Sequence, residues 1–197
     1  AYIPFLGETK HPAMLGAPGR EAWSEIWPAI GPMHDEVRAG RATWVEDLQF
    51  FFARRLPLEE VYVTFSYSPI LAEDAHTLEG VFCVCAETTE RVLGERRLST
   101  LRDLGLWVSE QCAVDAACRK AVEVLDANPL DIPFAAIYLL DEDGATARRI
   151  AGTRLPNDPS MFPAVIPLSG HAAPWPLAAV ARTQKAVEVR NLPSRGS

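Results

Sequence analysis

The sequence predicts an α+β chain whose strands form antiparallel sheets, and three observations carry that prediction. Val61–Ser68 alternates apolar and polar residues with period two, as a half-buried strand does. Glu87–Leu125 instead carries charged and apolar residues at helical spacing. Phe134–Leu140 and Thr146–Gly152 form a second expected strand pair, because an acidic turn ending in Gly144 separates them.

Composition and charge restrict the class of protein. With 197 residues, the chain can form one large domain or two small ones. Its formal net charge of -7 argues against nucleic acid as the main partner. No apolar run approaches the roughly 18 residues that a transmembrane helix needs, and no export signal is apparent. The four cysteines fall inside expected helices and strands, so we expect a reduced, cytoplasmic protein.

Residues 1–40 predict short helices interrupted by proline and glycine. One apolar face is indicated by four large side chains at three- and four-residue spacing: Trp23, Ile26, Trp27 and Ile30. Pro28 and Pro32 are expected to limit helix length here, because proline lacks the backbone N–H that a helix interior needs.

The first sheet is expected to contain three extended segments, beginning with Thr43–Phe52 and Val61–Ser68. The alternation of the second segment places four side chains on one face: Val61, Val63, Phe65 and Tyr67. Residues 71–77 form a polar connection to the third segment. That segment, Gly80–Ala86, is apolar on both faces, which predicts a central strand.

The charged helix that starts near Glu87 carries a short apolar seam. The seam has near-heptad spacing, with Gly105 in its gap: Leu98, Leu101, Val108 and Cys112. A second helix, Ala113–Leu125, is expected to end before Pro129. After the second strand pair, residues 153–174 are rich in loops, Trp175–Thr183 predicts a helix and Ala186–Arg190 predicts a strand.

The first part of the chain, residues 1–92, resembles a PAS domain. The more specific pieces are the strand end Phe65-Ser66-Tyr67-Ser68-Pro69-Ile70 and the tetrapeptide Glu87-Thr88-Thr89-Glu90. The resemblance implies a sheet with flanking helices, from which the first two strands of the family are missing. It also implies a ligand cavity for a small apolar molecule, lined by one strand face: Val63, Phe65, Tyr67, Cys83 and Cys85. A filled core is the alternative for this face, because apolar strand faces are usually packed.

The last part, residues 113–197, resembles the start of a GAF domain. A helix leads to Phe134–Leu140, an acidic glycine turn and a return strand, followed by Trp175-Pro176-Leu177 and a short helix. Residues 93–112 then form a linker helix between the two parts. The later GAF strands are missing and both ends look cut, so we expect a fragment of a longer protein.

A PAS domain joined to a GAF domain through a helix resembles the input region of a bacterial two-component sensor histidine kinase. The resemblance implies a homodimer through the linker helix and a downstream kinase or other output domain. The residues that would transmit the signal are Glu87, Thr89, Leu98, Leu101 and Val108. We identify no catalytic residue in this chain. The alternatives are a stand-alone PAS–GAF interaction module, or the input region of a PP2C-like phosphatase or a diguanylate cyclase.

The sequence identifies no cofactor, and it disfavours flavin and haem. Light-sensing PAS relatives carry a flavin-reactive cysteine, whereas Leu15–Trp27 contains none. His34 is a weak haem candidate, since it also fits a solvated helix residue beside Asp35 and Glu36. For Cys83 and Cys85, a packed pair of small side chains is favoured over a metal site, which would need further ligands.

Overall fold

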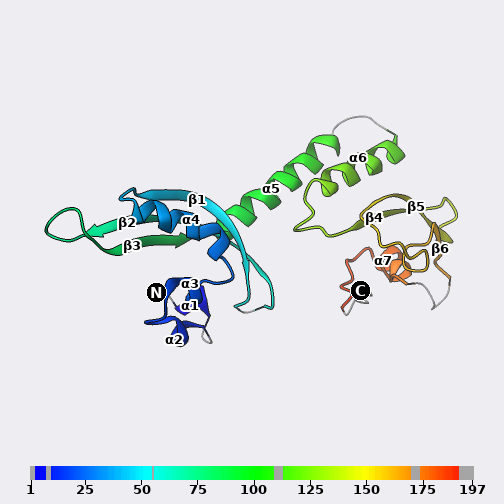
Figure 1. Ribbon diagram of the computed structural model, residues 1–197. Helices are drawn as coiled ribbons and strands as arrows, with labels where there is room; N and C mark the ends of the chain where they lie inside the picture. The colour runs from blue at the N-terminus through cyan, green and yellow to red at the C-terminus, as the bar shows by residue number, and fades with distance from the viewer. Residues whose placement is uncertain (1–2, 8–9, 55, 109–112, 170–173, 191–197) are drawn as a thin grey trace. The chain divides into compact units, whose positions relative to one another are not determined.

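The computed structural model describes residues 3–7, 10–54, 56–108, 113–169 and 174–190. The chain forms two compact units, Ala1–Glu95 and Arg96–Ser197. Each unit combines helices with a three-stranded antiparallel sheet, which confirms the predicted α+β class (Figure 1). Among the described residues, no helix has both the length and the apolar character to cross a bilayer.

The first unit contains four helices followed by a sheet with strand order β1-β2-β3. The helices are α1 (Ile3–Leu6), α2 (His11–Met14), α3 (Gly19–Ala22) and α4 (Trp27–Arg38). The strands are β1 (Thr43–Phe52), β2 (Glu59–Leu71) and β3 (Leu78–Glu87), joined as two antiparallel hairpins.

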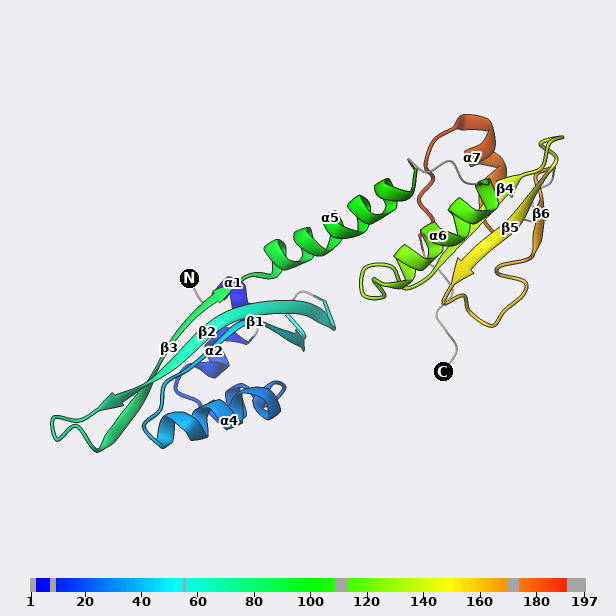
Figure 2. The ribbon, with the colours of Figure 1, turned by 90° about the horizontal axis from the view of Figure 1, so that it is seen from above.

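The core of this unit lies between β2 and α4 (Figure 2). All four residues of the predicted inward face are buried: Val61, Val63, Phe65 and Tyr67. Ile30 and Val37 of α4 pack on this face, and they lie about two helical turns apart. The alternating pattern therefore correctly identified the face of β2 that the helix covers.

The expectation that Pro28 and Pro32 limit the helix was wrong, because α4 runs continuously through both of them. Pro28 stands in the first turn, where its missing N–H has no helical acceptor. Pro32 removes only the bond to the carbonyl of Pro28, and both residues are exposed, so water can satisfy that carbonyl. The cost of Pro32 is therefore confined to one solvated turn.

The prediction of a central third strand was also wrong. Within the described residues, β3 pairs only with β2, so it lies at one edge of the sheet. The apolar side chains on its two faces lie in different environments. Val81 packs against the core, whereas Phe82 and Val84 point away from it and are exposed. An apolar strand can thus be an edge strand when no further strand covers it.

Helix α5 (Thr89–Val108) follows β3 directly and continues into the second unit (Figure 1). The remaining elements are α6 (Val114–Asp126), β4 (Ala135–Leu140), β5 (Thr146–Thr153), β6 (Val165–Pro167) and α7 (Leu177–Thr183). The strand β6 was not predicted, and residues 186–190 do not form the expected strand. Ala113 is extended, with ψ 143, so α6 begins as a separate helix, and the predicted seam residue Cys112 lies outside the described residues.

The second sheet has the order β4-β5-β6, and α6 packs on β4 and β5. The second unit also contains an aromatic cluster of Phe134, Phe162 and Trp175, whose ring centroids are 5.1 to 6.3 Å apart. Arg154 fastens the helix to the sheet, because its guanidinium donates to the carbonyls of Leu125 and Asp126, where α6 ends. A cation at this helix end also matches the helix dipole.

Candidate functional site

The turn from β3 into α5 is held by an ion-pair cluster around Arg54. Its guanidinium binds both carboxylate oxygens of Glu87, at 2.7 and 2.9 Å, and its Nε lies 2.7 Å from Glu59. The Arg54 side chain is nearly buried. The hydrogen bonds that Arg54 donates to Glu87, reinforced by the one to Glu59, raise the pKa of Arg54 above its ordinary value. The last residue of β3 is thus fixed to the end of β1 by a bidentate contact.

Thr89, the first residue of α5, is fixed to the central strand. Its hydroxyl accepts the backbone N–H of Tyr62 at 3.0 Å and donates to Glu87 at 2.9 Å. The N–H of Thr88 donates to the carbonyl of Tyr62 at 2.8 Å. The predicted transmission residues Glu87 and Thr89 therefore lie in one hydrogen-bonded group, which joins β2 to the start of α5.

A β-bulge in β1 supplies a second attachment, which the sequence analysis missed. The pairing with β2 shifts between Val45 and Leu48, and Asp47 in that bulge has a φ of 50°. This left-handed conformation is unusual for a residue with a side chain. The N–H of Asp47 donates to the hydroxyl of Thr64 at 3.0 Å, which helps to hold the strained backbone.

The Asp47 carboxylate reaches across to α5. It accepts the Thr88 hydroxyl at 2.6 Å and the Arg91 guanidinium at 2.6 Å. The hydrogen bond from Thr88, followed by that from Arg91, holds the pKa of Asp47 below its ordinary value. We call the three residues Asp47, Thr88 and Arg91 the bulge latch. The latch and the Arg54 cluster attach the first turn of α5 to all three strands of the sheet.

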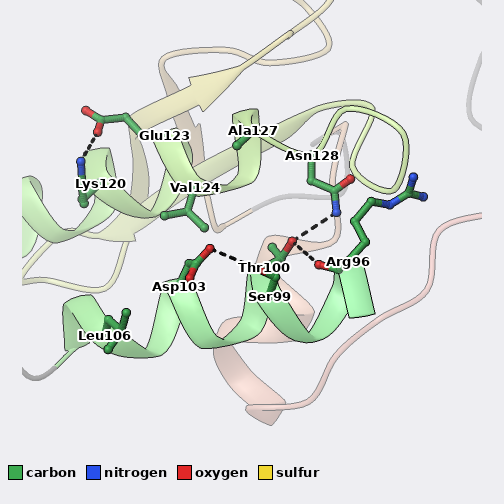
Figure 3. Close-up of a pocket in the computed structure, with 10 residues that line it drawn as sticks. All are labelled: Arg96, Ser99, Thr100, Asp103, Leu106, Lys120, Glu123, Val124, Ala127 and Asn128. Atoms are coloured by element: carbon green, nitrogen blue, oxygen red, sulfur yellow. Dashed lines mark hydrogen bonds and ion pairs between the residues drawn. The ribbon is translucent and has the colours of Figure 1, made fainter. Parts of the chain in front are cut away.

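Within the second unit, one face of α5 borders a polar groove of about 720 Å³ (Figure 3). The α5 residues on this face share three- and four-residue spacing: Arg96, Ser99, Thr100, Asp103 and Leu106. Across the groove lie Lys120 and Glu123 of α6, and Asn128 beyond its end. Figure 3 shows these side chains joined by hydrogen bonds among themselves, including Asn128 to Thr100 at 3.2 Å.

Asp131 secures this part of α5 to the second unit. It receives Arg96 at 2.8 Å, Arg97 at 3.3 Å and the side-chain amide of Asn128 at 2.9 Å. The hydrogen bond from Arg96, aided by Asn128, lowers the pKa of Asp131 to about 2. Helix α5 is thus tied to the first unit near Arg91 and to the second unit near Arg96.

The predicted seam lies on the face of α5 opposite the groove. Leu98 is 67% exposed and Leu101 is 64% exposed. Gly94 and Gly105 share this face by helical spacing, and a side chain built at either would meet nothing within 4 Å. Val108 ends α5, and its side chain is outside the described part. An apolar face that stays exposed among the described residues is typical of a helix that packs against another chain.

The five predicted pocket residues line one cavity, together with aromatic side chains of the first helices. They are Val63, Phe65, Tyr67, Cys83 and Cys85. The cavity holds about 70 Å³, well below the roughly 300 Å³ typical of ligand pockets. Burial, and then the neighbouring Cys85, raises the pKa of Cys83 to about 11, which keeps its thiol protonated. The geometry favours the packed-core alternative, and ligand binding at this place stays a prediction.

The haem candidate His34 packs against two aromatic rings. Its ring centroid lies 5.1 Å from that of Trp27 and 4.5 Å from that of Tyr67. The 70 Å³ cavity that Tyr67 helps to line is far too small for a haem. Burial, followed by the charge of Arg38, lowers the pKa of His34, while Asp35 opposes this shift.

We expect the stability of the first unit to fall in mild acid because of His34. The folded state binds the His34 proton less readily than the unfolded chain, so this contribution is complete above pH 6.5 and is lost below it. The variant His34→Phe keeps a stacking ring without a titrating group. Urea unfolding at about pH 7.5 and about pH 5.5 should therefore show a smaller loss for the variant than for the wild type. Equal losses would contradict the assignment.

A larger pocket lies in the second unit and was not predicted. It holds about 380 Å³, and its mainly apolar lining includes the aromatic cluster together with Val180, Val187 and Val189. The polar atoms nearby are already engaged: Tyr138 donates to the carbonyl of Pro163 and Trp175 to that of Met161. Such a lining suits an uncharged apolar molecule.

Comparisons with known proteins assign no family to the chain. No family model matches it, and no curated protein matches it. Within the described residues, no group of three or more His, Cys, Asp or Glu side chains is arranged to hold a metal ion.

Proposed function

We propose that this chain is a sensory and regulatory input region of a bacterial signal-transduction protein, of the two-component sensor histidine kinase kind. In this proposal the first unit is a PAS-like domain, α5 is the signalling helix and the second unit is the start of a GAF-like domain. One observation carries the proposal: α5 is tied by polar clusters at its first turn and again at Arg96, while its leucine face is left exposed.

The attachments make α5 responsive to the sheet. A movement of β1 would alter the Arg54 cluster and the bulge latch together, because Arg54 closely follows this strand and Asp47 lies within it. A rotation of α5 would then change which residues it presents to a second copy. A ligand or partner can drive this change only through different affinities for the two states.

A small apolar ligand would act at the second unit in this proposal. The pocket of about 380 Å³ falls within the range of ligand sites, whereas the first unit offers only about 70 Å³. Because Arg96 and Asp131 tie α5 to this unit, occupation of the pocket could reach the same helix from its other end.

We expect Leu101→Asp to abolish self-association of the chain. A charge on the exposed leucine face would have to be buried against a second copy, so the dimer dissociation constant should rise by at least about 100-fold. Leu106→Asp is the matched control, because it adds the same charge to the groove face of the same helix. Sedimentation equilibrium measures both variants. A dimer that survives Leu101→Asp unchanged would remove the proposed role of α5.

The coding region beyond Ser197 separates the proposed output types. A helix with a phospho-acceptor histidine followed by a glycine-rich ATP-binding domain would support the kinase. A phosphatase or cyclase domain would replace the kinase in the same scheme. A stop codon after a completed second domain would favour the alternative of an interaction module, whose partner a pull-down would identify.

A further inference from the structure

Two cysteines share one face of the edge strand β3. Cys83 and Cys85 are separated by one residue, so the alternation of a strand points both side chains to the same side. In the register, Cys83 lies opposite Tyr67 and Cys85 lies opposite Phe65. Both cysteines are nevertheless exposed, and among the described residues β3 pairs only with β2. A small solute can therefore reach the two thiols together.

The two thiols also lie close enough to interact with each other. Burial is the main cause of the raised pKa of Cys83, about 11, and the charge of Cys85 and a hydrogen bond between the two side chains add to it. Cys83 is therefore a protonated thiol at neutral pH. We call Cys83 and Cys85 the thiol pair, because their geometry allows both sulfur atoms to bond one atom placed between them.

The surroundings of the thiol pair restrict its ligand. A zinc ion would need about four ligands, and the described residues offer no group of three or more His, Cys, Asp or Glu side chains that could hold a metal ion. A cation would also have to displace the proton of Cys83. The cavity that both cysteines border holds about 70 Å³, and the rest of its lining is apolar or aromatic. A matching ligand is small, uncharged and able to bond two protonated thiols.

We propose that the thiol pair binds a trivalent metalloid hydroxide, with arsenous acid, As(OH)₃, as its simplest form. Each thiol replaces one hydroxide: an S–H bond and an As–O bond break, while an As–S bond and an O–H bond form. Two water molecules leave, arsenic keeps its third hydroxide, and no atom is oxidised or reduced. Because each proton leaves with a hydroxide, the raised pKa of Cys83 does not oppose the reaction. The site needs one copy of the chain, so it is independent of the proposed signalling role of α5.

Isothermal titration calorimetry of the reduced full chain with sodium arsenite tests the site. We expect one arsenic atom per chain, and Cys83→Ser should weaken binding by at least about 100-fold, because a single thiol loses the advantage of a second, intramolecular bond. The double variant Cys85→Ser/Ala86→Cys keeps the number of thiols but moves one to the opposite face of β3, and it should lose binding to the same extent. Cys112→Ser/Cys118→Ser is the matched control, which removes the other two cysteines and should bind arsenite as the wild type does. Circular dichroism verifies that each variant folds.

The outcomes decide between a chelate on β3 and binding elsewhere. Loss of binding in both β3 variants, with binding retained in the control, supports the thiol pair. Undiminished binding in either β3 variant, or loss of binding in the control, would place arsenic on other thiols and overturn the proposal. A wild-type chain that binds no arsenic at about 1 mM arsenite would overturn it as well. None of these results changes the expected effect of Leu101→Asp on self-association, so the proposed function is tested separately.

Discussion

Replacing Arg54 with alanine should destabilise the first unit by about 3 kcal/mol. The guanidinium pairs with Glu59, whose side chain is 13% exposed, and with Glu87, whose side chain is 31% exposed, and both carboxylates would lose this cation. Three hydrogen bonds at 2.7 to 2.9 Å would be lost at the same time. The free energy of unfolding of this unit, from hydrogen exchange of the β2 amides, measures the effect.

Two further variants make the Arg54 result specific. Arg38→Ala removes an exposed cation whose carboxylate partner, Asp35, lies 3.7 Å away, and it should cost no more than about 0.5 kcal/mol. Adding Glu87→Gln to Arg54→Ala removes one of the two carboxylate charges that lose Arg54 and should recover part of the loss. Equal small effects of Arg54→Ala and Arg38→Ala would show that the cluster is not a major source of stability.

Replacing Asp47 with alanine should detach the first turn of α5 from the sheet. Thr88 and Arg91 would lose their shared acceptor, and alanine tolerates a φ of 50° less well than aspartate. The amides of residues 91–95 should exchange with solvent at least about 10-fold faster, while those of β2 keep their protection. The readout is local, so it distinguishes loss of the bulge latch from general unfolding.

The controls for Asp47 come from the same bulge. Asp47→Asn keeps an acceptor for Thr88 but lacks the negative charge that Arg91 binds, so its effect should be intermediate. Glu46→Ala removes the exposed neighbouring carboxylate and should leave the amides of residues 91–95 unchanged. Faster exchange in Glu46→Ala, or none in Asp47→Ala, would contradict a latch centred on Asp47.

The parts of the fold that follow a local rule were predictable. Alternation from Val61 to Tyr67 correctly identified the buried face, and the acidic turn at Gly144 correctly joined β4 to β5. The position of β3 was not predictable, because an apolar strand pattern does not reveal how many strands pair with it. The effect of Pro32 depends on where its helix begins, and the spacing of the apolar residues did not reveal that α4 begins at Trp27.

The candidate site was only half predictable for a similar reason. Glu87 and Thr89 stood out through their place at a strand end, but their partners come from distant segments. Arg91 lies 44 residues from Asp47, and a pair so separated leaves no periodic trace. One signal was present in the sequence: the apolar residues Val45 and Leu48 are three positions apart, which interrupts strict alternation and indicates a bulge.

The order of the strands has a consequence for how the chain is made. Both sheets are meanders, in which each strand pairs with the strand that precedes it in the chain. Such a sheet needs no later segment to complete its pairing, and its contacts are close in sequence, a property of fast-folding proteins. The first unit can therefore assemble while the ribosome is still translating the second. The start of α5 would then meet a finished sheet as it emerges from the exit tunnel.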